Sequence, residues 1–230
     1  MIELSTLISR HARFRPDATA VVFESRRLTY REFWARVARV GNLLRGLGLG
    51  PGDKVATVSP NSLELLEIYS AVPTIGATLV PLSPLLLPAG LASLIRGSDA
   101  RCLIAHASLL PVLEAIRADL PPNVLIIDGA AEGFGDYHAL TAVQSEELCP
   151  ADSGPDDLFN IMFTSGTTGL PKGIMHTHYI RAMYCTLMAA AFRMTPESRT
   201  LHTGAIVFNG AFVTLMPTFY LGATYILQAV

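Results

Sequence analysis

Hydrophobic positions along this chain follow two alternating periods. Phe33, Val37, Val40, Leu44 and Leu47 lie three or four residues apart, which places them on one face of a helix. Elsewhere, short apolar runs are bounded by glycine, proline or polar residues, a pattern that predicts strands. Because the two patterns take turns along the chain, the sequence predicts an α/β fold with mixed, largely parallel sheets flanked by helices.

The same criteria place the individual elements. Helices are expected at Ser5–Phe14, between Thr29 and Gly48, and at Ser62–Thr74, Ala89–Arg96, Leu109–Leu120, His178–Phe192 and Ala211–Tyr220. Strands are expected at Ala18–Phe23, Lys54–Val58, Thr78–Val80, Arg101–Ala105, Val124–Ile127, Leu201–Val207 and Ala223–Leu227. Phe134–Pro155 is rich in glycine and polar residues and is expected to be a surface connection, with a subdivision of the chain near residues 144–157.

The helix between Thr29 and Gly48 carries signals at both ends. Thr29 and Glu32 have the spacing of a capping box, in which each side chain accepts a hydrogen bond from the other residue's free backbone N–H. Gly48 follows the last periodic position and is suited to end the helix. In the later helix, Tyr184 and Leu187 cluster on one face with Met188 and Ala191.

The most informative chemistry lies in a short polar stretch between two apolar strand-like segments. Residues Thr164–Gly173 read Thr-Ser-Gly-Thr-Thr-Gly-Leu-Pro-Lys-Gly, with three glycines, four hydroxyl side chains and one lysine. Glycines let backbone N–H groups turn toward an anion, and a concave set of such groups favours phosphate oxygens. Lys172 adds a mobile positive charge, and Pro171 stiffens its approach. The stretch therefore predicts a polyphosphate-binding loop.

Two other interpretations of this loop need consideration. A Walker A loop needs a Gly-Lys pair followed by Ser or Thr at the start of a helix, whereas Lys172 lies between Pro171 and Gly173 and precedes a strand-like segment. The chain is therefore not a P-loop NTPase. The other alternative is a solvated glycine-rich turn that binds no ligand, since such loops are common at protein surfaces.

The segment Phe163–Gly173 resembles the signature phosphate loop of the adenylate-forming superfamily, which includes acyl-CoA synthetases, luciferases and peptide-synthetase adenylation domains. Ala71–Pro84 and the Leu28-Thr29-Tyr30 entry resemble further parts of the family. The resemblance spans nearly the whole chain and implies the N-terminal portion of the adenylate-forming fold.

For an intact enzyme, the resemblance implies an AMP-forming acid–thiol ligase of the acyl-CoA synthetase class. A carboxylic acid, fatty or aromatic, would react with ATP and Mg²⁺ to form an acyl-adenylate, and coenzyme A would then take the acyl group. Lys172 and Thr164 would act in catalysis, with no metal ligand assigned in this chain. The expected nucleotide-binding residues are Thr164, Ser165, Gly166, Thr167, Thr168, Gly169 and Lys172.

The resemblance also suggests where the acid would bind. The family often places an aromatic residue or histidine near a glycine beside the carboxylate substrate, and here the corresponding stretch is Phe208-Asn209-Gly210. Phe208 is expected to be a wall of the acyl pocket and Asn209 a polar neighbour, against the alternative that Phe208 is ordinary core. His176 and His178 have a spacing that a metal could use on a strand, but without a third ligand packing or capping is favoured.

Later motifs of the family, including the ribose aspartate and the lysine of the mobile C-terminal domain, do not occur in residues 1–230. The chain is therefore expected to be an incomplete N-terminal domain, truncated and inactive alone. Two alternatives stay open. One is a non-catalytic nucleotide-binding or interaction protein that kept the loop, and the other is the adenylation domain of another adenylate-forming enzyme.

Composition bears on the binding partners, the cellular location and the membrane association of the chain. A net charge of −2 without long charge runs leaves no electrostatic footprint for nucleic acid. Three widely spaced cysteines and an N-terminus unlike a secretory signal indicate a cytoplasmic protein. The hydrophobic share of 50% suggests self-association through surface meant for the missing segment. Residues 200–230 lack Asp, Glu, Lys and Arg, yet Asn, Gly and Pro interrupt them, which favours buried α/β structure over a membrane span.

Overall fold

The computed structural model describes residues 2–164 and 171–229. It contains a seven-stranded sheet in the order β7-β6-β5-β3-β4-β8-β9 and a four-stranded sheet in the order β10-β11-β1-β2. Most neighbouring strands are parallel, and the two antiparallel pairs are β1–β2 and β8–β9. The structure therefore confirms the predicted α/β class with mixed, largely parallel sheets.

The elements have the following bounds. The helices are α1 (Leu7–Phe14), α2 (Tyr30–Gly46), α3 (Leu63–Thr74), α4 (Pro88–Ser98), α5 (Leu110–Ala115), α6 (Tyr137–Ala142), α7 (His178–Ala191) and α8 (Phe212–Leu221), with 3-10 turns η1 (Leu4–Thr6), η2 (Ala107–Leu109), η3 (Arg117–Asp119) and η4 (Asn209–Ala211). The strands are β1 (Thr19–Phe23), β2 (Arg26–Thr29), β3 (Lys54–Val58), β4 (Thr78–Leu82), β5 (Cys102–His106), β6 (Asn123–Ile127), β7 (Gly135–Asp136), β8 (Leu158–Thr164), β9 (Lys172–Thr177), β10 (Arg199–His202) and β11 (Thr224–Leu227).

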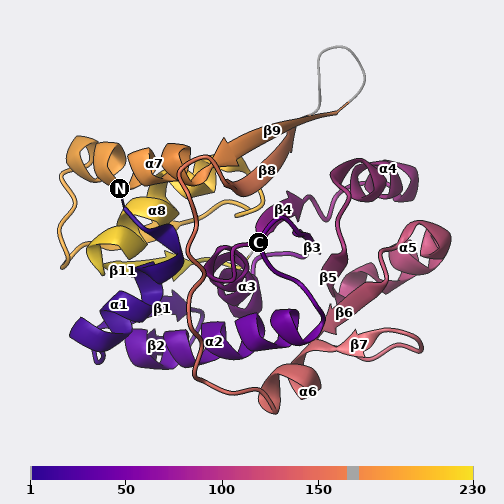
Figure 1. The fold of residues 1–230 in the computed structure, drawn as a ribbon, viewed down its shortest axis with the longest axis horizontal. Helices are drawn as coiled ribbons and strands as arrows, with labels where there is room; N and C mark the ends of the chain where they lie inside the picture. The colour runs from indigo at the N-terminus through magenta and orange to yellow at the C-terminus, as the bar shows by residue number, and fades with distance from the viewer. Residues whose placement is uncertain (1, 165–170, 230) are drawn as a thin grey trace.

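The seven-stranded sheet is covered by helices on both faces. Successive side chains of a strand point to opposite faces, so Val55 packs into the core with α2 and α3, while Ala56 packs into a second core with α4 and α5. Figure 1 shows α4 and α5 together on one side of the molecule, away from α1 and α2. Burial on both faces explains why these strands read as continuous apolar runs.

The four-stranded sheet joins segments that are far apart in the sequence. β1 pairs in parallel with β11, with Val21 opposite Tyr225. The Tyr30 hydroxyl at the start of α2 donates to the carbonyl oxygen of Ala223 at 2.7 Å. Segments from the first and last thirds of the chain, including α2, α3 and α8, therefore share one hydrophobic core.

Most predicted elements are confirmed, and the differences have simple causes. The Thr29–Glu32 capping box forms as expected, and Gly48 ends the helix with a φ of 76°. The structure contains β2, β7 and α6, which the sequence patterns did not predict, because each is six residues or shorter and carries little periodicity. The expected strand Leu201–Val207 is wrong beyond His202, and the expected helix Leu109–Leu120 is divided into η2, α5 and η3.

The connection over residues 144–157 runs along the outside of α2. Arg39 pairs with Glu146 there, and the Asn42 amide donates to the carbonyl oxygens of Ser145 and Glu147. Strands from both sides of this connection share the seven-stranded sheet through the β4–β8 pair. The division of the chain at this point stays a prediction.

None of the helices in residues 2–164 and 171–229 combines the length and the hydropathy needed to cross a membrane. The uncharged stretch from residue 200 instead supplies β10, η4, α8 and β11, and α8 is largely buried.

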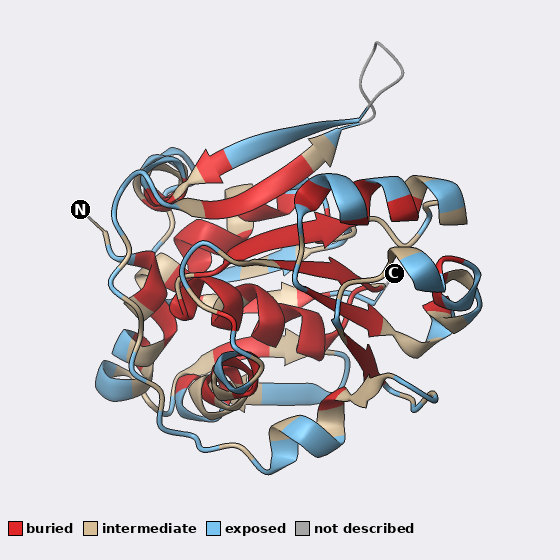
Figure 2. Ribbon diagram, turned by 45° about the vertical axis from the view of Figure 1, so that its right-hand side comes forward, coloured by how far each residue is buried: buried red, intermediate tan, exposed pale blue. Residues whose placement is uncertain are grey.

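Exposed apolar side chains gather on β9, on α7 and directly after it, where Met175, Tyr179, Leu187 and Phe192 all reach solvent. Figure 2 shows much of β9 exposed, in contrast to the buried strands at the centre of the molecule. Because apolar surface of this kind favours association, we expect the average mass of the chain in solution to rise with concentration. Multi-angle light scattering measures this, and replacing Leu187 and Phe192 with serine should weaken it. A monomer at high concentration would contradict the expectation.

Candidate functional site

The predicted phosphate loop is carried by an antiparallel hairpin of β8 and β9. Their register places Thr164 directly opposite Lys172 and Phe163 opposite Gly173. A Cβ on Gly173 would lie 2.9 Å from Ile161 and 3.3 Å from the Phe163 ring, so a glycine lets these side chains pack across the hairpin. The structure therefore brings together the first predicted loop residue and the predicted lysine, which are eight positions apart in the sequence.

Residues 165–170 of the loop lie outside the described part of the chain. They include five predicted nucleotide-binding residues, Ser165, Gly166, Thr167, Thr168 and Gly169, whose contacts stay predictions. Lys172 is exposed at the start of β9, and it is one of two lysines in the sequence.

Two hollows lie beside the loop end of this hairpin and share Phe163, Thr164, Val207 and Phe208 in their walls. The first, of about 180 Å³, extends toward the carboxyl end of β4, where Ser83 lines it. The second, of about 340 Å³, contains the polar side chains of Thr164, His176 and Asn209 among apolar neighbours. The loop end of the hairpin and the Phe208–Asn209 segment therefore border the same hollows.

Phe208 is not a core residue, because 57% of it is exposed. It immediately precedes η4, and it lines both hollows. Asn209 lines the second hollow, whereas Gly210 lies in η4 and lines neither. The part that Phe208, Asn209 and Gly210 would take in binding an acid stays a prediction.

The sequence patterns missed a buried polar cluster behind the second hollow. Arg181 on α7 is fully buried, and its Nε donates to Asn160 Oδ1 at 2.8 Å while its Nη2 donates to Asn209 Oδ1 at 2.9 Å. The buried face of α7 is formed by Arg181 with Ala182, Cys185 and Ala189, and not by the Tyr184–Leu187 face. Asn160 within an apolar strand was the available signal, since a buried polar side chain needs a partner.

The two histidines of the His-x-His pair belong to different elements. His176 lies on β9, and His178 begins α7 and packs edge-on against Phe159, with ring centroids 5.3 Å apart. Burial, followed by the nearby charge of Arg181, lowers the pKa of His176 to about 4, so this imidazole is neutral at pH 7. Within residues 2–164 and 171–229, no three His, Cys, Asp or Glu side chains are placed to hold a metal.

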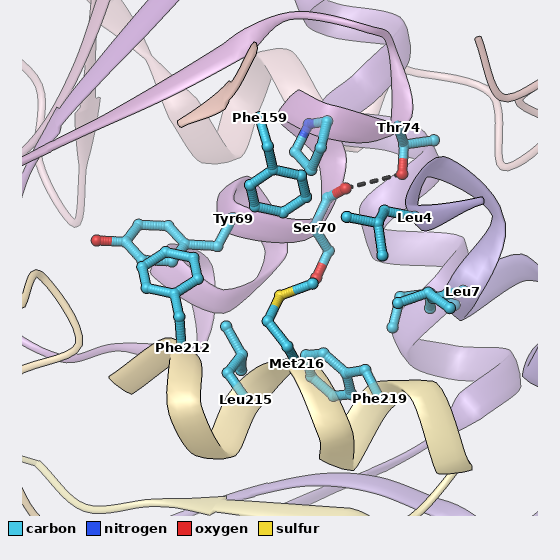
Figure 3. A pocket seen from close by; sticks show the side chains of 12 residues that line it. Leu4, Leu7, Tyr69, Ser70, Thr74, Phe159, Phe212, Leu215, Met216 and Phe219 are labelled. Carbon is cyan, nitrogen blue, oxygen red and sulfur yellow. Dashed lines mark hydrogen bonds between the residues drawn. The ribbon is translucent and has the colours of Figure 1, made fainter. Parts of the chain in front are cut away.

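A separate apolar cavity of about 30 Å³ lies between η1, α1, α3 and α8. Figure 3 shows Leu4, Leu7, Phe212, Leu215 and Phe219 around it, and the Thr74 hydroxyl donating to the backbone carbonyl of Ser70 at 2.7 Å. The cavity is largely apolar and has room for only about one or two water molecules, which is the size of a packing gap.

Comparisons with known proteins agree with this geometry. The family model described as "AMP-binding enzyme" matches residues 8–229. A long-chain-fatty-acid–CoA ligase of Thermus thermophilus is 37% identical over 171 residues, which cover 73% of this chain and 31% of that protein. A crotonobetaine/carnitine–CoA ligase of Salmonella typhi is 34% identical over 226 residues, covering 92% of this chain and 43% of that protein.

The solved structures show the same relationship. The anthranilate–CoA ligase AuaEII, in complex with anthranoyl-AMP, superposes with a TM-score of 0.93 at 27% identity and covers 100% of this chain and 45% of its own. The chain thus spans less than half the length of these three proteins, and matches the N-terminal part of their shared fold. The family match, the relatives and the hairpin geometry together show that this chain belongs to the AMP-binding enzyme family of adenylate-forming ligases.

Proposed function

We propose that this chain supplies the polyphosphate loop and one wall of the acid pocket of an AMP-forming acyl-CoA synthetase. The observation that carries the proposal is the hairpin register, which sets Thr164 opposite Lys172 beside hollows that Phe208 also lines. This arrangement supports the binding of a triphosphate at the loop end of the hairpin and of a carboxylic acid next to it.

The chemistry that this surface would assist has two steps. A carboxylate oxygen bonds to the α-phosphorus of ATP as pyrophosphate leaves, and the thiol sulfur of coenzyme A then bonds to the acyl carbon as AMP leaves. The first step brings an anion to a polyanion, so it needs positive charge and hydrogen-bond donors near the phosphates. The Lys172 ammonium would supply positive charge, and the Thr164 hydroxyl would donate a hydrogen bond to a phosphate oxygen.

Mg²⁺, the carboxylic acid and coenzyme A are each supported by different observations. Mg²⁺ would accompany the triphosphate, and the described residues hold no group of three His, Cys, Asp or Glu side chains placed to bind a metal. The acid would lie against Phe208 and the other apolar walls, which suit a fatty or aromatic acyl group. No described contact identifies the coenzyme A site, and coenzyme A as the acceptor rests on the named relatives.

Removing the loop lysine tests the proposal. We expect Lys172→Ala to weaken ATP binding about tenfold, since a charged hydrogen bond to phosphate contributes about 1.5–3 kcal/mol before solvent exposure reduces it. Isothermal titration of the 230-residue chain with MgATP measures the change. Arg199→Ala, which removes an exposed cation on β10, is the control and should bind like the original chain. Equal affinities for Lys172→Ala and the original chain would refute the role of the loop.

We further propose that residues 1–230 alone do not complete adenylation, because they span only 31–43% of the relatives compared above. Pyrophosphate exchange into ATP in the presence of hexanoate should stay at background. Exchange above background that Lys172→Ala abolishes would show instead that the chain is a sufficient catalyst.

A further inference from the structure

Arg181 is the largest fully buried side chain of the described residues, and it hydrogen-bonds to Asn209, which lines the second hollow. Its guanidinium packs 4.1 Å from the centroid of the Phe212 ring and 4.9 Å from that of Tyr184. Two of its nitrogens donate to Asn160 and Asn209, and the third, Nη1, has no hydrogen-bond partner among the described residues.

No carboxylate of the described residues forms an ion pair with this guanidinium. Burial lowers the pKa of Arg181 to about 10, so it is still charged at pH 7. A buried charge without a counterion costs several kcal/mol, and an apolar side chain of similar volume would satisfy the packing at least as well. Packing alone therefore gives no reason for an arginine at this position.

The hydrogen bonds of Arg181 determine how Asn209 is oriented. Arginine only donates, so the Asn209 atom that faces it must be the carbonyl oxygen Oδ1. The amide nitrogen Nδ2 is then the polar group that Asn209 can offer to the second hollow, which it lines. Asn209 itself is exposed, so without Arg181 its side chain would rotate and present either end.

The apolar lining of the second hollow would let the Asn209 amide distinguish between acyl groups. Its walls are largely apolar, including Met162, Ile174, Val207 and Phe208, and its polar groups are the Thr164 hydroxyl, the neutral His176 imidazole and the Asn209 amide. A hydrogen-bond donor held in an apolar hollow loses water when an acyl group enters. It therefore favours an acyl group that offers an acceptor and disfavours a pure hydrocarbon.

We propose that Arg181 is a positioning residue that holds the Asn209 amide toward the acyl group, so that the pocket selects carboxylic acids carrying a hydrogen-bond acceptor, such as a keto or hydroxyl oxygen, over plain hydrocarbon acids. The inference rests on the proposed function, because it assumes that this hollow receives the acyl group.

Two acids of equal chain length test the selectivity. Dissociation constants of 5-oxohexanoate and hexanoate are measured by titrating the ¹⁵N-labelled 230-residue chain, with MgATP binding measured separately. We expect 5-oxohexanoate to bind about tenfold tighter, which corresponds to about 1.4 kcal/mol. The Asn209 side-chain amide resonance, assigned from its loss in Asn209→Ala, should move with 5-oxohexanoate and not with hexanoate.

Three variants separate positioning from packing. Arg181→Met preserves volume, and Asn209→Ala removes the donor from an exposed residue, so the second variant should fold even if the first does not. Both should reduce the preference to between one- and twofold, while Arg199→Met, which changes an exposed arginine, should keep it near tenfold.

The results distinguish this inference from the proposed function. Equal binding of both acids by the original chain, binding of neither, or an undiminished preference in Asn209→Ala or in folded Arg181→Met would overturn the positioning role. If MgATP still binds in a Lys172-dependent manner, only the inference fails; if it does not, the proposed function fails as well.

Discussion

Replacing Phe33 with alanine is expected to lower the free energy of unfolding by about 3–5 kcal/mol, the range for truncating a buried phenylalanine. Phe33 lies on α2 with no exposed surface, and its ring is 5.6 Å from the ring of Phe219 on α8. The substitution removes contacts that join an early helix to a late one, and the surrounding β-sheet limits how far the cavity can collapse. Loss of this contact therefore weakens the whole core and not one helix.

Urea unfolding followed by circular dichroism measures this change. Phe14→Ala is the matched control, because Phe14 is 70% exposed at the end of α1 and its loss should change the free energy by less than about 0.5 kcal/mol. Phe33→Leu, which keeps most of the volume, should fall between the two. A loss below about 1 kcal/mol for Phe33→Ala would mean that α2 and α8 are not packed as the structure has them.

The second large effect concerns a buried carboxyl group on α3. The Glu67 carboxylate accepts hydrogen bonds from Arg36 Nε at 2.5 Å and from the Tyr137 hydroxyl at 3.1 Å. A second carboxylate oxygen, Glu64 Oε1, lies 3.7 Å from Arg36 Nη2. Burial raises the pKa of Glu67 from 4.5 to about 7, which Arg36 opposes and the Glu64 charge reinforces. The carboxyl group therefore binds its proton more tightly in the folded chain than in the unfolded chain.

This difference predicts how stability depends on pH. The contribution of Glu67 is fully present below about pH 4.5 and is lost as the pH rises through about 7. A change of this size corresponds to about 3 kcal/mol. Glu67→Gln, which keeps the shape and cannot ionise, should remove that part of the pH dependence.

Urea midpoints of the two proteins between pH 4.5 and 8 measure the effect. Burial lowers the pKa of His176 and His178, which adds a slope of opposite sign, so the difference between Glu67→Gln and the original chain is the informative quantity. We expect that difference to move in favour of Glu67→Gln as the pH rises. Glu146→Gln, at an exposed ion pair with Arg39, should follow the original profile. Parallel profiles for Glu67→Gln and the original chain would rule out an elevated pKa.

Local patterns were sufficient wherever neighbours in the sequence make the deciding contacts. The capping box needs only Thr29 and Glu32, and the helix between Thr29 and Gly48 shows its buried face through regular spacing. Short elements such as β2 and β7 have too few positions for a period to emerge, and they exist because a neighbouring strand pairs with them. The inner face of α7 also escaped prediction, because its largest buried side chain is a charged one.

The candidate site also has features that the sequence predicts and features that only the tertiary structure shows. The sequence by itself determined the α/β class and the family, because the alternating apolar periods and the glycine, hydroxyl and lysine content of Thr164–Gly173 are local properties of the chain. Only the tertiary structure decided that Thr164 and Phe208 share a surface and that Arg181 lies behind Asn209. These pairs come from separate elements, whose proximity depends on how β8, α7 and η4 pack, and no local pattern carries that information.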